Sequence, residues 1–325
     1  MAFSMVGIWV TASLIPLDAR YKPPPAKENN LDSGSDKRAD DPLVVLGRER
    51  KVIVQRLGEE PEERADVVET GTSTVPTFPR VFDFADDATL ATKGAAGIDE
   101  NALVEYQLLG VGVRTVSFLG IQVYVVGVYV ATEDIATLQN RLIRHITATG
   151  TTLVAGEKGK LRDMLMDPVK GVEIWDDILK DTNVKTCVRI VPTRNTDFHH
   201  LRDAWVRHVT AKAQSNKEEY GDEAFGDAVG EFKQLFNRGS VPKGKELLLN
   251  RNQKGRLAIW WDDGKHGAQR LGEVRDERIG RALWLNYLAG KTVASEPARK
   301  QIVDSLMEFV ERPVGTVATK IDLHV

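Results

Sequence analysis

Two long stretches rich in β-branched and aromatic residues follow one another in this 325-residue chain, and they constrain its fold more than any other feature. The first covers residues 103–119 and the second covers residues 121–130, with only Gly120 between them. Residues of these types favour strands, and a glycine between two strands favours a tight connection. The sequence therefore predicts an antiparallel hairpin.

Three glycines, Gly110, Gly112 and Gly127, interrupt the predicted strands. A glycine inside a strand commonly marks a bulge, or the close approach of a ligand or another backbone. Gly110 and Gly112 also resemble part of a dinucleotide-binding fingerprint. Its third glycine would fall at Thr115, however, and the chain continues as a strand rather than a helix. We therefore reject a dinucleotide site.

The chain after this hairpin combines helical periodicity with further strands. Thr132 and Ser295 stand where helix N-caps are expected, and Pro297 stands at the first position of the last helix. Hairpins with helices between and after them favour an α+β domain, in which one antiparallel sheet carries helices on one face. The predicted helices cover residues 132–146, 157–166, 169–180, 197–213, 223–237, 276–288 and 296–309, and the predicted strands cover 184–192, 246–250 and 257–261.

The N-terminal part has a different composition. Residues 1–17 are apolar and uncharged, slightly shorter than the roughly 20 residues that span a bilayer as a helix, and broken by Pro16. They form either a membrane anchor, or the remnant of one, or a segment that is disordered or locally packed. Residues 18–64 are polar, charged and rich in proline near their start, so we expect a flexible linker in which residues 52–54 are an apolar island that could form a short strand. The folded domain is expected over residues 65–325.

Charge and cysteine content exclude several classes of protein. The formal net charge is −3 and no long run of like charge is present, which argues against a nucleic-acid partner. The single cysteine, Cys187, excludes intrachain disulfides and cysteine-based zinc sites. It stands in an alternating apolar stretch, so we expect a small apolar residue on a strand face.

Arg114, His200 and His208 are polar residues that could carry chemistry. Arg114 interrupts an apolar strand, and a buried guanidinium must pair with an anionic or polar group; the alternative is a strand residue that faces solvent. The glycines beside it leave room for a ligand. His200 and His208 are eight residues apart on a predicted helix, too far for one metal without other ligands. They are either ordinary helix histidines, or one of them is a haem ligand, since a single histidine suffices for haem.

The segment 108–130 resembles the signature hairpin of the chalcone isomerase superfamily. That hairpin has a Gly-x-Gly-x-Arg element, here ending at Arg114, and a strand that ends Gly-hydrophobic-Tyr-hydrophobic, here residues 127–130. Residues 282–297 resemble the family's late helix, which precedes a final helix. The sequence of residues 113–119 is most similar to that of the fungal mitochondrial branch, the "altered inheritance of mitochondria" proteins. The resemblance covers residues 65–325.

The resemblance implies an open-faced β-sandwich, a large antiparallel sheet backed by helices, with a ligand cleft between sheet and helices. It also implies that Arg114 lies in that cleft. The family arginine stabilises an oxyanion in plant chalcone isomerases and receives a carboxylate in fatty-acid-binding relatives, and a guanidinium has the fixed donors for either task. This chain departs from the plant pattern at Tyr124, where the plant enzymes carry a threonine, and at the late-helix polar pair, which falls at about Asn286 and Tyr287 with a larger side chain at the second position. The neighbourhood of the plant middle-helix tyrosine and asparagine holds His200, Arg202 and Trp205.

These departures argue against flavanone formation. We therefore predict a mitochondrial protein that binds a small hydrophobic, anionic ligand, haem or a fatty acid, without chalcone isomerase activity, and that contacts the inner membrane through its N-terminus. One alternative is an active intramolecular lyase on another substrate, with Arg114 and Tyr124 as catalytic residues. A second alternative is a membrane-tethered scaffold without a ligand. The predicted ligand-binding residues are Arg114, Tyr124, Asn286, Tyr287, His200 and Trp205, with His200 or His208 as the haem ligand.

Overall fold

The computed structural model describes residues 48–49, 51–54, 62–84, 103–117, 119–181, 183–265 and 268–314. The apolar segment 1–17 and most of the predicted linker lie outside these residues. Three strands nevertheless lie within the predicted linker: β1 (Arg48–Glu49), β2 (Lys51–Val54) and β3 (Glu62–Ala65). The apolar island therefore forms a strand, β2, which pairs with β3. Within the described parts of the chain, no helix is long and apolar enough to cross a membrane.

The predicted hairpin is formed by β7 (Val104–Val116) and β8 (Ile121–Ala131). The two strands are antiparallel, and their register shifts between Leu108 and Gly110 and again between Arg114 and Thr115. A shift of this kind is a bulge, which bends the strand and redirects the side chains beside it. Arg114 thus lies at a bulge, directly opposite Tyr124 of β8.

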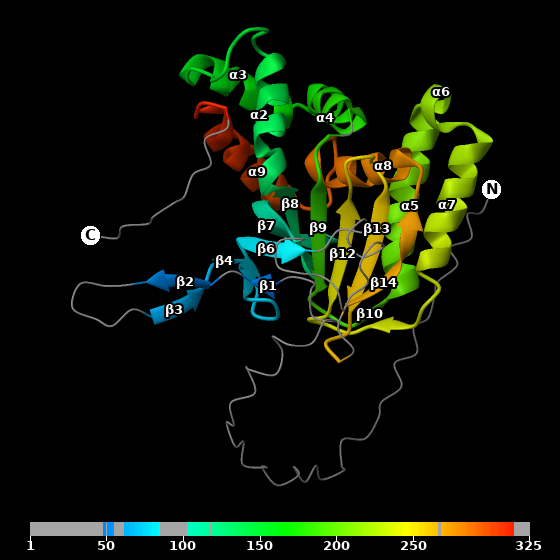
Figure 1. Ribbon diagram of the computed structural model, residues 1–325. Coiled ribbons are helices and arrows are strands. Elements are labelled where there is room, and N and C mark those ends of the chain that lie inside the picture. Colours follow the sequence, from blue (N-terminus) through cyan, green and yellow to red (C-terminus); the bar gives the residue numbers. More distant parts are fainter. Residues whose placement is uncertain are drawn as a thin grey trace, which may run out of the picture. The chain divides into compact units, whose positions relative to one another are not determined.

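The hairpin lies within an eight-stranded antiparallel sheet with the order β1-β6-β7-β8-β9-β12-β13-β14 (Figure 1). The second predicted hairpin, β12 and β13, is also confirmed. The edge strand β14 was not predicted, because its polar and half-exposed residues lack an apolar alternation. The remaining sheet strands are β6 (Val81–Phe84), β9 (Thr186–Pro192), β12 (Glu246–Arg251), β13 (Leu257–Asp262) and β14 (Ala268–Val274), and short pairs are formed by β4 (Val67–Glu69) with β5 (Thr77–Pro79) and by β10 (Thr196–Asp197) with β11 (Ser240–Val241).

The predicted helices are all present, with small differences at their ends. Ser295 caps its helix as predicted, by accepting a hydrogen bond from Ala298 N. The predicted cap at Thr132 is wrong: its hydroxyl donates to Glu105 of β7, and a short 3-10 helix forms there instead. The helices are η3 (Thr132–Asp134), α2 (Ile135–Arg144), α3 (Ala155–Met166), α4 (Lys170–Lys180), α5 (Phe198–Ser215), α6 (Lys217–Tyr220), α7 (Glu223–Leu235), α8 (Glu277–Leu288) and α9 (Glu296–Val310).

The two faces of the sheet belong to two different cores. Tyr124, Val126 and Val128 of β8 point into a large core shared with the helices, whereas Val125 and Tyr129 point into a smaller core on the opposite face. This alternation follows from the two-residue period of a strand. The arrangement confirms the predicted α+β fold, an antiparallel sheet backed by helices, with α9 packed against β7 and α7 against β14 (Figure 1).

Gly110 and Gly112 make room for a helix and not for a ligand. A Cβ atom on Gly112 would lie 2.5 Å from the backbone nitrogen of Ala298, and one on Gly110 would lie 2.6 Å from that of Ile302. Two hydrogen bonds join β7 to α9 and its N-cap: Ser295 Oγ donates to the carbonyl of Val113, and Val111 N donates to the side chain of Gln301. The expectation that these glycines leave space for a ligand is therefore wrong, because α9 occupies that space.

Candidate ligand-binding site

Arg114 and Tyr124 form a cross-strand pair on the helix-covered face of the sheet. The guanidinium carbon lies over the Tyr124 ring, 5.7 Å from its centroid, which is a cation–π contact. Arg114 is half-buried. Within the described parts of the chain its side chain forms neither a hydrogen bond nor an ion pair. The guanidinium donors are therefore available to a ligand.

Two helices complete the group around this pair. Tyr287 of α8 accepts a hydrogen bond from the indole nitrogen of Trp205 of α5 at 2.8 Å. The hydroxyls of Tyr287 and Tyr124 lie 3.4 Å apart. All three aromatic side chains are buried in the helix-side core. The structure thus brings together four residues that the sequence analysis selected: Arg114, Tyr124, Trp205 and Tyr287.

The chemistry of the donors fixes the direction of one of these two hydrogen bonds. An indole N–H can only donate, so the oxygen of Tyr287 is the acceptor. This oxygen keeps a second lone pair, so in the contact between Tyr287 and Tyr124 either hydroxyl can be the donor. Burial raises the pKa of Tyr287 well above its usual value, so this hydroxyl stays protonated. When Tyr287 is the donor to Tyr124, the Tyr124 hydroxyl and the Arg114 guanidinium are two neighbouring donors that a ligand can use.

His208 lies one turn after Trp205 on α5 and faces the same group. Its imidazole donates to the backbone carbonyl of Ala282, and Nε2 is buried without a partner, so the donor is Nδ1. Burial, together with the charges of Lys212 and Arg114, lowers the pKa of His208 to about 4. The imidazole is therefore neutral near pH 7, with one free acceptor nitrogen beside the Arg114 cation.

Two predicted residues lie apart from this group. His200 is exposed in the first turn of α5, where its backbone nitrogen donates to the capping side chain of Asp197. Asn286 is buried, but it precedes Tyr287 on α8 and therefore points to a different side of the helix. Its backbone carbonyl accepts from Ala294 at 2.7 Å, in the connection to α9. Asn286 therefore belongs to the junction of α8 and α9.

Cys187 lies on the opposite face of the sheet from Arg114. It is buried in the smaller core, as the alternating pattern around it predicted. Burial raises the pKa of its thiol well above the usual value. The thiol is therefore protonated at neutral pH, and it packs as a small apolar group.

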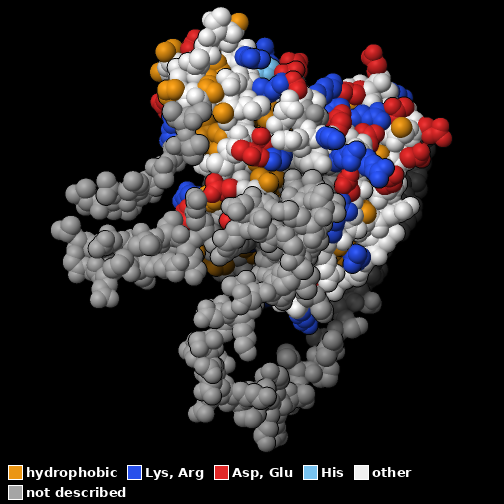
Figure 2. All heavy atoms as spheres, viewed as in Figure 1, with side chains coloured by type: hydrophobic (Ala, Val, Ile, Leu, Met, Phe, Trp, Pro, Cys, Tyr) orange, Lys and Arg blue, Asp and Glu red, His pale blue; other side chains and the backbone are white. Residues whose placement is uncertain are grey.

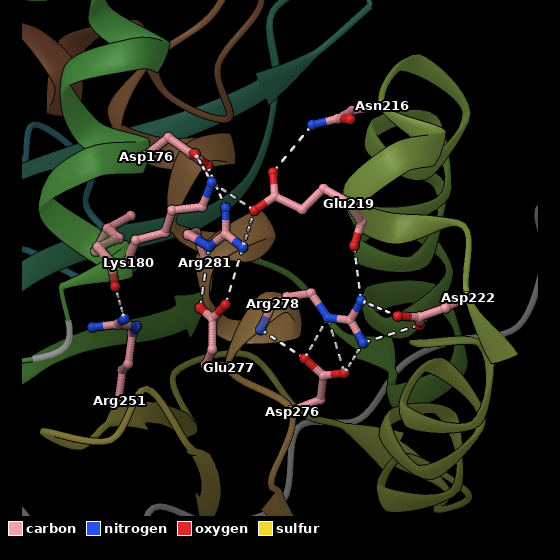
Figure 3. A network of polar contacts seen from close by, with 11 residues as sticks. Asp176, Lys180, Asn216, Glu219, Asp222, Arg251, Asp276, Glu277, Arg278 and Arg281 are labelled. Atoms are coloured by element: carbon pink, nitrogen blue, oxygen red, sulfur yellow. Dashed lines mark hydrogen bonds and ion pairs between the residues drawn. The ribbon is translucent and has the colours of Figure 1, made fainter. Parts of the chain in front are cut away.

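A network of charged side chains around the buried Arg281 holds α8, the helix that carries Tyr287. Arg281 is 1% exposed, and its guanidinium contacts Asp176 of α4 at 2.7 Å, Glu219 of α6 at 2.8 Å and Glu277 at 3.0 Å (Figure 3). Lys180 of α4 also reaches Glu219, at 2.7 Å. Sequence reasoning missed this network. The four-residue spacing of Glu277 and Arg281 was a visible signal, but the partners on α4 and α6 are brought in only by the fold.

A second cluster continues the network at the start of α8. Arg278 contacts Asp276 at 2.6 Å and Asp222, the N-cap of α7, at 2.8 Å (Figure 3). Arg251 of β12 is buried nearby and donates to the backbone carbonyl of Leu179, and burial lowers the pKa of Arg251 to about 10. These contacts tie α8 to its neighbours on several sides and so fix the position of Tyr287.

A surface hollow of about 560 Å³ lies away from the Arg114 group, along α3 and the start of α4. Its lining carries two lysines and two aspartates, and none of the Arg114 group contributes to it. The cleft that the family resemblance implies at Arg114 therefore stays a prediction. The lining residues are Gly156, Gly159, Lys160, Asp163, Met164, Asp167 and Lys170.

Comparison with known proteins identifies the family. A family model described as chalcone isomerase like matches residues 104–303. The chain is 32% identical to "Altered inheritance of mitochondria protein 18, mitochondrial" of Debaryomyces hansenii over 238 residues, which is 72% of this chain and 73% of that protein. It is 27% identical to the protein of the same name from a strain of Saccharomyces cerevisiae over 259 residues, 77% of each chain.

A solved structure shares the fold. It is a fatty-acid binding protein of Arabidopsis thaliana, which superposes with a TM-score of 0.51 at 18% identity and covers 75% of this chain and 98% of its own. The fold, the hairpin that carries Arg114 and the family match over residues 104–303 all agree. This chain belongs to the chalcone isomerase-like family.

Proposed function

We propose that this protein binds an apolar ligand that carries an anionic group, with Arg114 as the anion contact and Tyr124 as a second donor. The observation that carries the proposal is the half-buried guanidinium without an acidic partner in the described parts of the chain. A cation partly withdrawn from water favours an anion that restores its lost interactions. The buried aromatic side chains around it favour an apolar body on the same ligand.

A fatty acid fits this description, because it joins one carboxylate to a long apolar chain. The carboxylate would accept from the Arg114 guanidinium and from the Tyr124 hydroxyl, with Tyr287 then donating its own hydrogen to Tyr124. The structurally similar Arabidopsis protein is named as a fatty-acid binding protein, which supports this ligand class.

Haem is a second candidate ligand, because the side chains at this site include types that bind haem. An imidazole whose Nδ1 is held by a backbone carbonyl and whose Nε2 is free has the form of a metal-binding histidine, and His208 has this form. Arg114 and Lys212 would then donate to the propionates. Haem would supply a redox-active iron, and the chain's own residues would bind and orient it. His200 is exposed and does not share these features.

We propose a mitochondrial location for the protein. Its relatives are named as mitochondrial proteins, over 72% of this chain in one case and 77% in another. Fluorescence microscopy of the full chain with a C-terminal fluorescent tag tests the location, and a signal that does not coincide with a mitochondrial dye would contradict it.

Ligand titration of the full chain tests the proposed function. The probes are a fluorescent long-chain fatty acid and haemin, the latter followed by its Soret band. We expect Arg114→Gln to weaken binding of the true ligand by about tenfold or more, since hydrogen bonds to charged groups contribute about 1.5–3 kcal/mol. Tyr124→Phe should weaken it less, and His208→Gln should change the Soret band only if haem is the ligand.

Arg207→Gln is the matched control, because Arg207 is an exposed arginine on α5. It should bind like the unmodified protein. Equal binding by the Arg114 and Arg207 variants would contradict the proposal. If neither probe binds, the scaffold without a ligand becomes the better description.

An intramolecular lyase is the second candidate, favoured by the same two donors. Arg114 and Tyr124 could stabilise an oxyanion that develops during cyclisation, since preorganised donors at a developing charge accelerate such steps. Incubation with chalcones tests this activity by the loss of their yellow absorbance. A rate equal to that in buffer alone rules out flavonoid cyclisation.

A further inference from the structure

The tip of the β7–β8 hairpin exposes large apolar side chains. Leu119 is 69% exposed and Val116 is 41% exposed. Two hydrogen bonds lie in the turn: Leu119 N donates to Ser117 Oγ at 3.3 Å, and Gly120 N donates to the Ser117 carbonyl at 3.2 Å. Leu119 and Val116 therefore present apolar groups to the surroundings.

Two exposed basic residues lie on the loops beside the tip, and exposed Asp197 follows three residues after the first of them. The sequence holds no charged residue from 115 to 123. The next loop carries exposed Arg194, which follows the hydrogen bond from Thr193 N to the Val123 carbonyl. Exposed Lys243 lies beside that loop, because its backbone nitrogen donates to the Asn195 side chain at 3.0 Å. In the described parts of the chain, neither cation has a carboxylate within ion-pair distance.

We propose that this tip docks the protein on an anionic lipid surface. Leu119 and Val116 enter the boundary between headgroups and acyl chains, and Arg194 and Lys243 lie against the lipid phosphates. Apolar insertion and electrostatic attraction to anionic lipids are the two forces that hold peripheral proteins on a bilayer. The tip has residues for both forces on adjacent loops of one sheet end.

A second exposed apolar site carries charges of both signs and provides a comparison. Hydrophobic side chains gather over α3 in Figure 2, and Val154 and Val169, at the starts of α3 and α4, are 67% and 63% exposed. Asp163 and Asp167 lie in the same region. Hydrogen bonds from the backbone nitrogens of Lys170 and Val169 lower the pKa of Asp167, so it stays charged. Lys160 and Lys170 line the same region, so this site combines carboxylates that repel an anionic bilayer with lysines that attract it.

The tip is two residues along β7 from Arg114. A fatty acid that leaves the bilayer beside Val116 would therefore meet the guanidinium first. This connection rests on the proposed function, whereas docking itself depends only on the exposed residues of the tip.

A local fluorescent probe tests the docking. The full chain is labelled with an environment-sensitive dye at Leu119→Cys or, as the matched control, at Val169→Cys; the native Cys187 is buried and stays unlabelled. With vesicles of phosphatidylcholine and phosphatidylglycerol, we expect a blue shift at position 119 and none at 169, and high salt should weaken it. No shift at 119, or equal shifts at both positions, would overturn the proposal.

The same probe separates a bilayer from a second copy of the chain. A blue shift at 119 that develops without vesicles and grows with protein concentration would show self-association, and would also overturn the proposal. Residues 1–17 are present in both labelled proteins, so any membrane contact that they make affects both equally.

Two variants separate docking from ligand binding. Leu119→Ser should weaken vesicle co-sedimentation by about tenfold relative to Val169→Ser, as the loss of one inserted leucine implies, while fatty-acid binding in solution is unchanged. Arg114→Gln should have the opposite effects. Retained docking by Leu119→Ser would contradict the docking proposal alone, and retained ligand binding by Arg114→Gln would contradict the proposed function alone.

Discussion

At the scale of single residues, the candidate site depends on which atoms can donate and which cannot. Trp205 has only a donor, so Tyr287 accepts from it, and either of the neighbouring hydroxyls of Tyr287 and Tyr124 can donate to the other. His208 adds an acceptor, because its other nitrogen is committed to the Ala282 carbonyl. The Arg114 cation, the Tyr124 hydroxyl and the free imidazole nitrogen of His208 thus lie together among apolar side chains. This arrangement suits a ligand with a polar end group.

The low pKa of His208 predicts a specific dependence of stability on pH. Burial and the nearby Lys212 and Arg114 lower the pKa from 6.5 to about 4, so between these values the unfolded chain binds a proton that the folded chain does not. The free energy of unfolding therefore falls as the pH drops from about 6.5 toward 4, by up to about 2 kcal/mol at pH 5. Urea unfolding at pH 7 and pH 5 measures the change.

His208→Gln should remove this part of the pH dependence, and His199→Gln, at an exposed position on the same helix, should retain it. The interpretation fails if the His208→Gln protein loses as much stability between pH 7 and pH 5 as the unmodified protein.

At the scale of elements, α9 replaces a strand along one edge of β7. The neighbouring strand β6 pairs with β7 only as far as Gln107, and the edge beyond that point is covered by α9. Ser295 and Gln301 satisfy one carbonyl and one N–H of this edge. The helix can approach so closely only because β7 carries glycines there.

Gly112→Ala should therefore destabilise the protein by about 1–3 kcal/mol, as expected for overpacking. The added Cβ would lie 2.5 Å from Ala298 N and 2.6 Å from Ser295 Oγ, both within or beside a helix that has nowhere to move. Gly226→Ala on α7 is the control: nothing lies within 4 Å of its added Cβ, and alanine is the better helix former by about 1 kcal/mol. Thermal unfolding compares the stability of the two variants. Unchanged stability of Gly112→Ala would show that α9 moves to accommodate the added Cβ.

The charged network around Arg281 joins α4, α6 and α8, and its loss should be costly. Arg281→Met leaves Asp176, Glu219 and Glu277 close together without their shared cation, at an expected cost of about 3–5 kcal/mol. Arg162→Met removes an exposed pair with Asp304 and should cost less than about 1 kcal/mol. Urea unfolding measures both, and equal losses would mean that burial adds nothing to the Arg281 contacts.

At the scale of the whole molecule, the candidate site exists only in the folded chain. Its residues come from the β7–β8 hairpin, from α5 and from α8, and the hydrogen bond between Trp205 and Tyr287 joins positions 82 residues apart. Charges of both signs are interspersed on the surface near α4, α6 and α7 (Figure 2). This part of the surface therefore has no large positively charged patch that would compete with Arg114 for an anionic ligand.

A ligand of this site should therefore stabilise the whole chain. At a free ligand concentration of 100 times the dissociation constant, the free energy of unfolding should rise by about 2.7 kcal/mol, because the unfolded chain does not bind. Urea unfolding with and without the fatty acid or haemin measures the rise. Arg114→Gln, which should bind about tenfold more weakly, should show a rise of no more than about 1.4 kcal/mol at the same concentration; the same stabilisation in both proteins would place the ligand elsewhere.

Local patterns in the sequence determined the β7–β8 hairpin, the helices and the position of Arg114 opposite the strand that carries Tyr124. These depend on neighbours within one or two turns or strands, so β-branched runs, helical spacing and turn glycines are enough to predict them. The family resemblance added Trp205 and Tyr287 to the candidate site. Local patterns did not reveal β14, whose polar residues pair at an edge and need no apolar alternation.

Only the tertiary structure determined which distant segments of the chain contact one another. It placed α9 against Gly110 and Gly112, gave Arg281 its partners on α4 and α6, and left His200 exposed while His208 faces Arg114. Each of these contacts joins segments far apart in sequence, and each depends on the angle at which a helix packs. One glycine pattern is compatible with a ligand or a helix, and only packing, which fills every available space, selects between them.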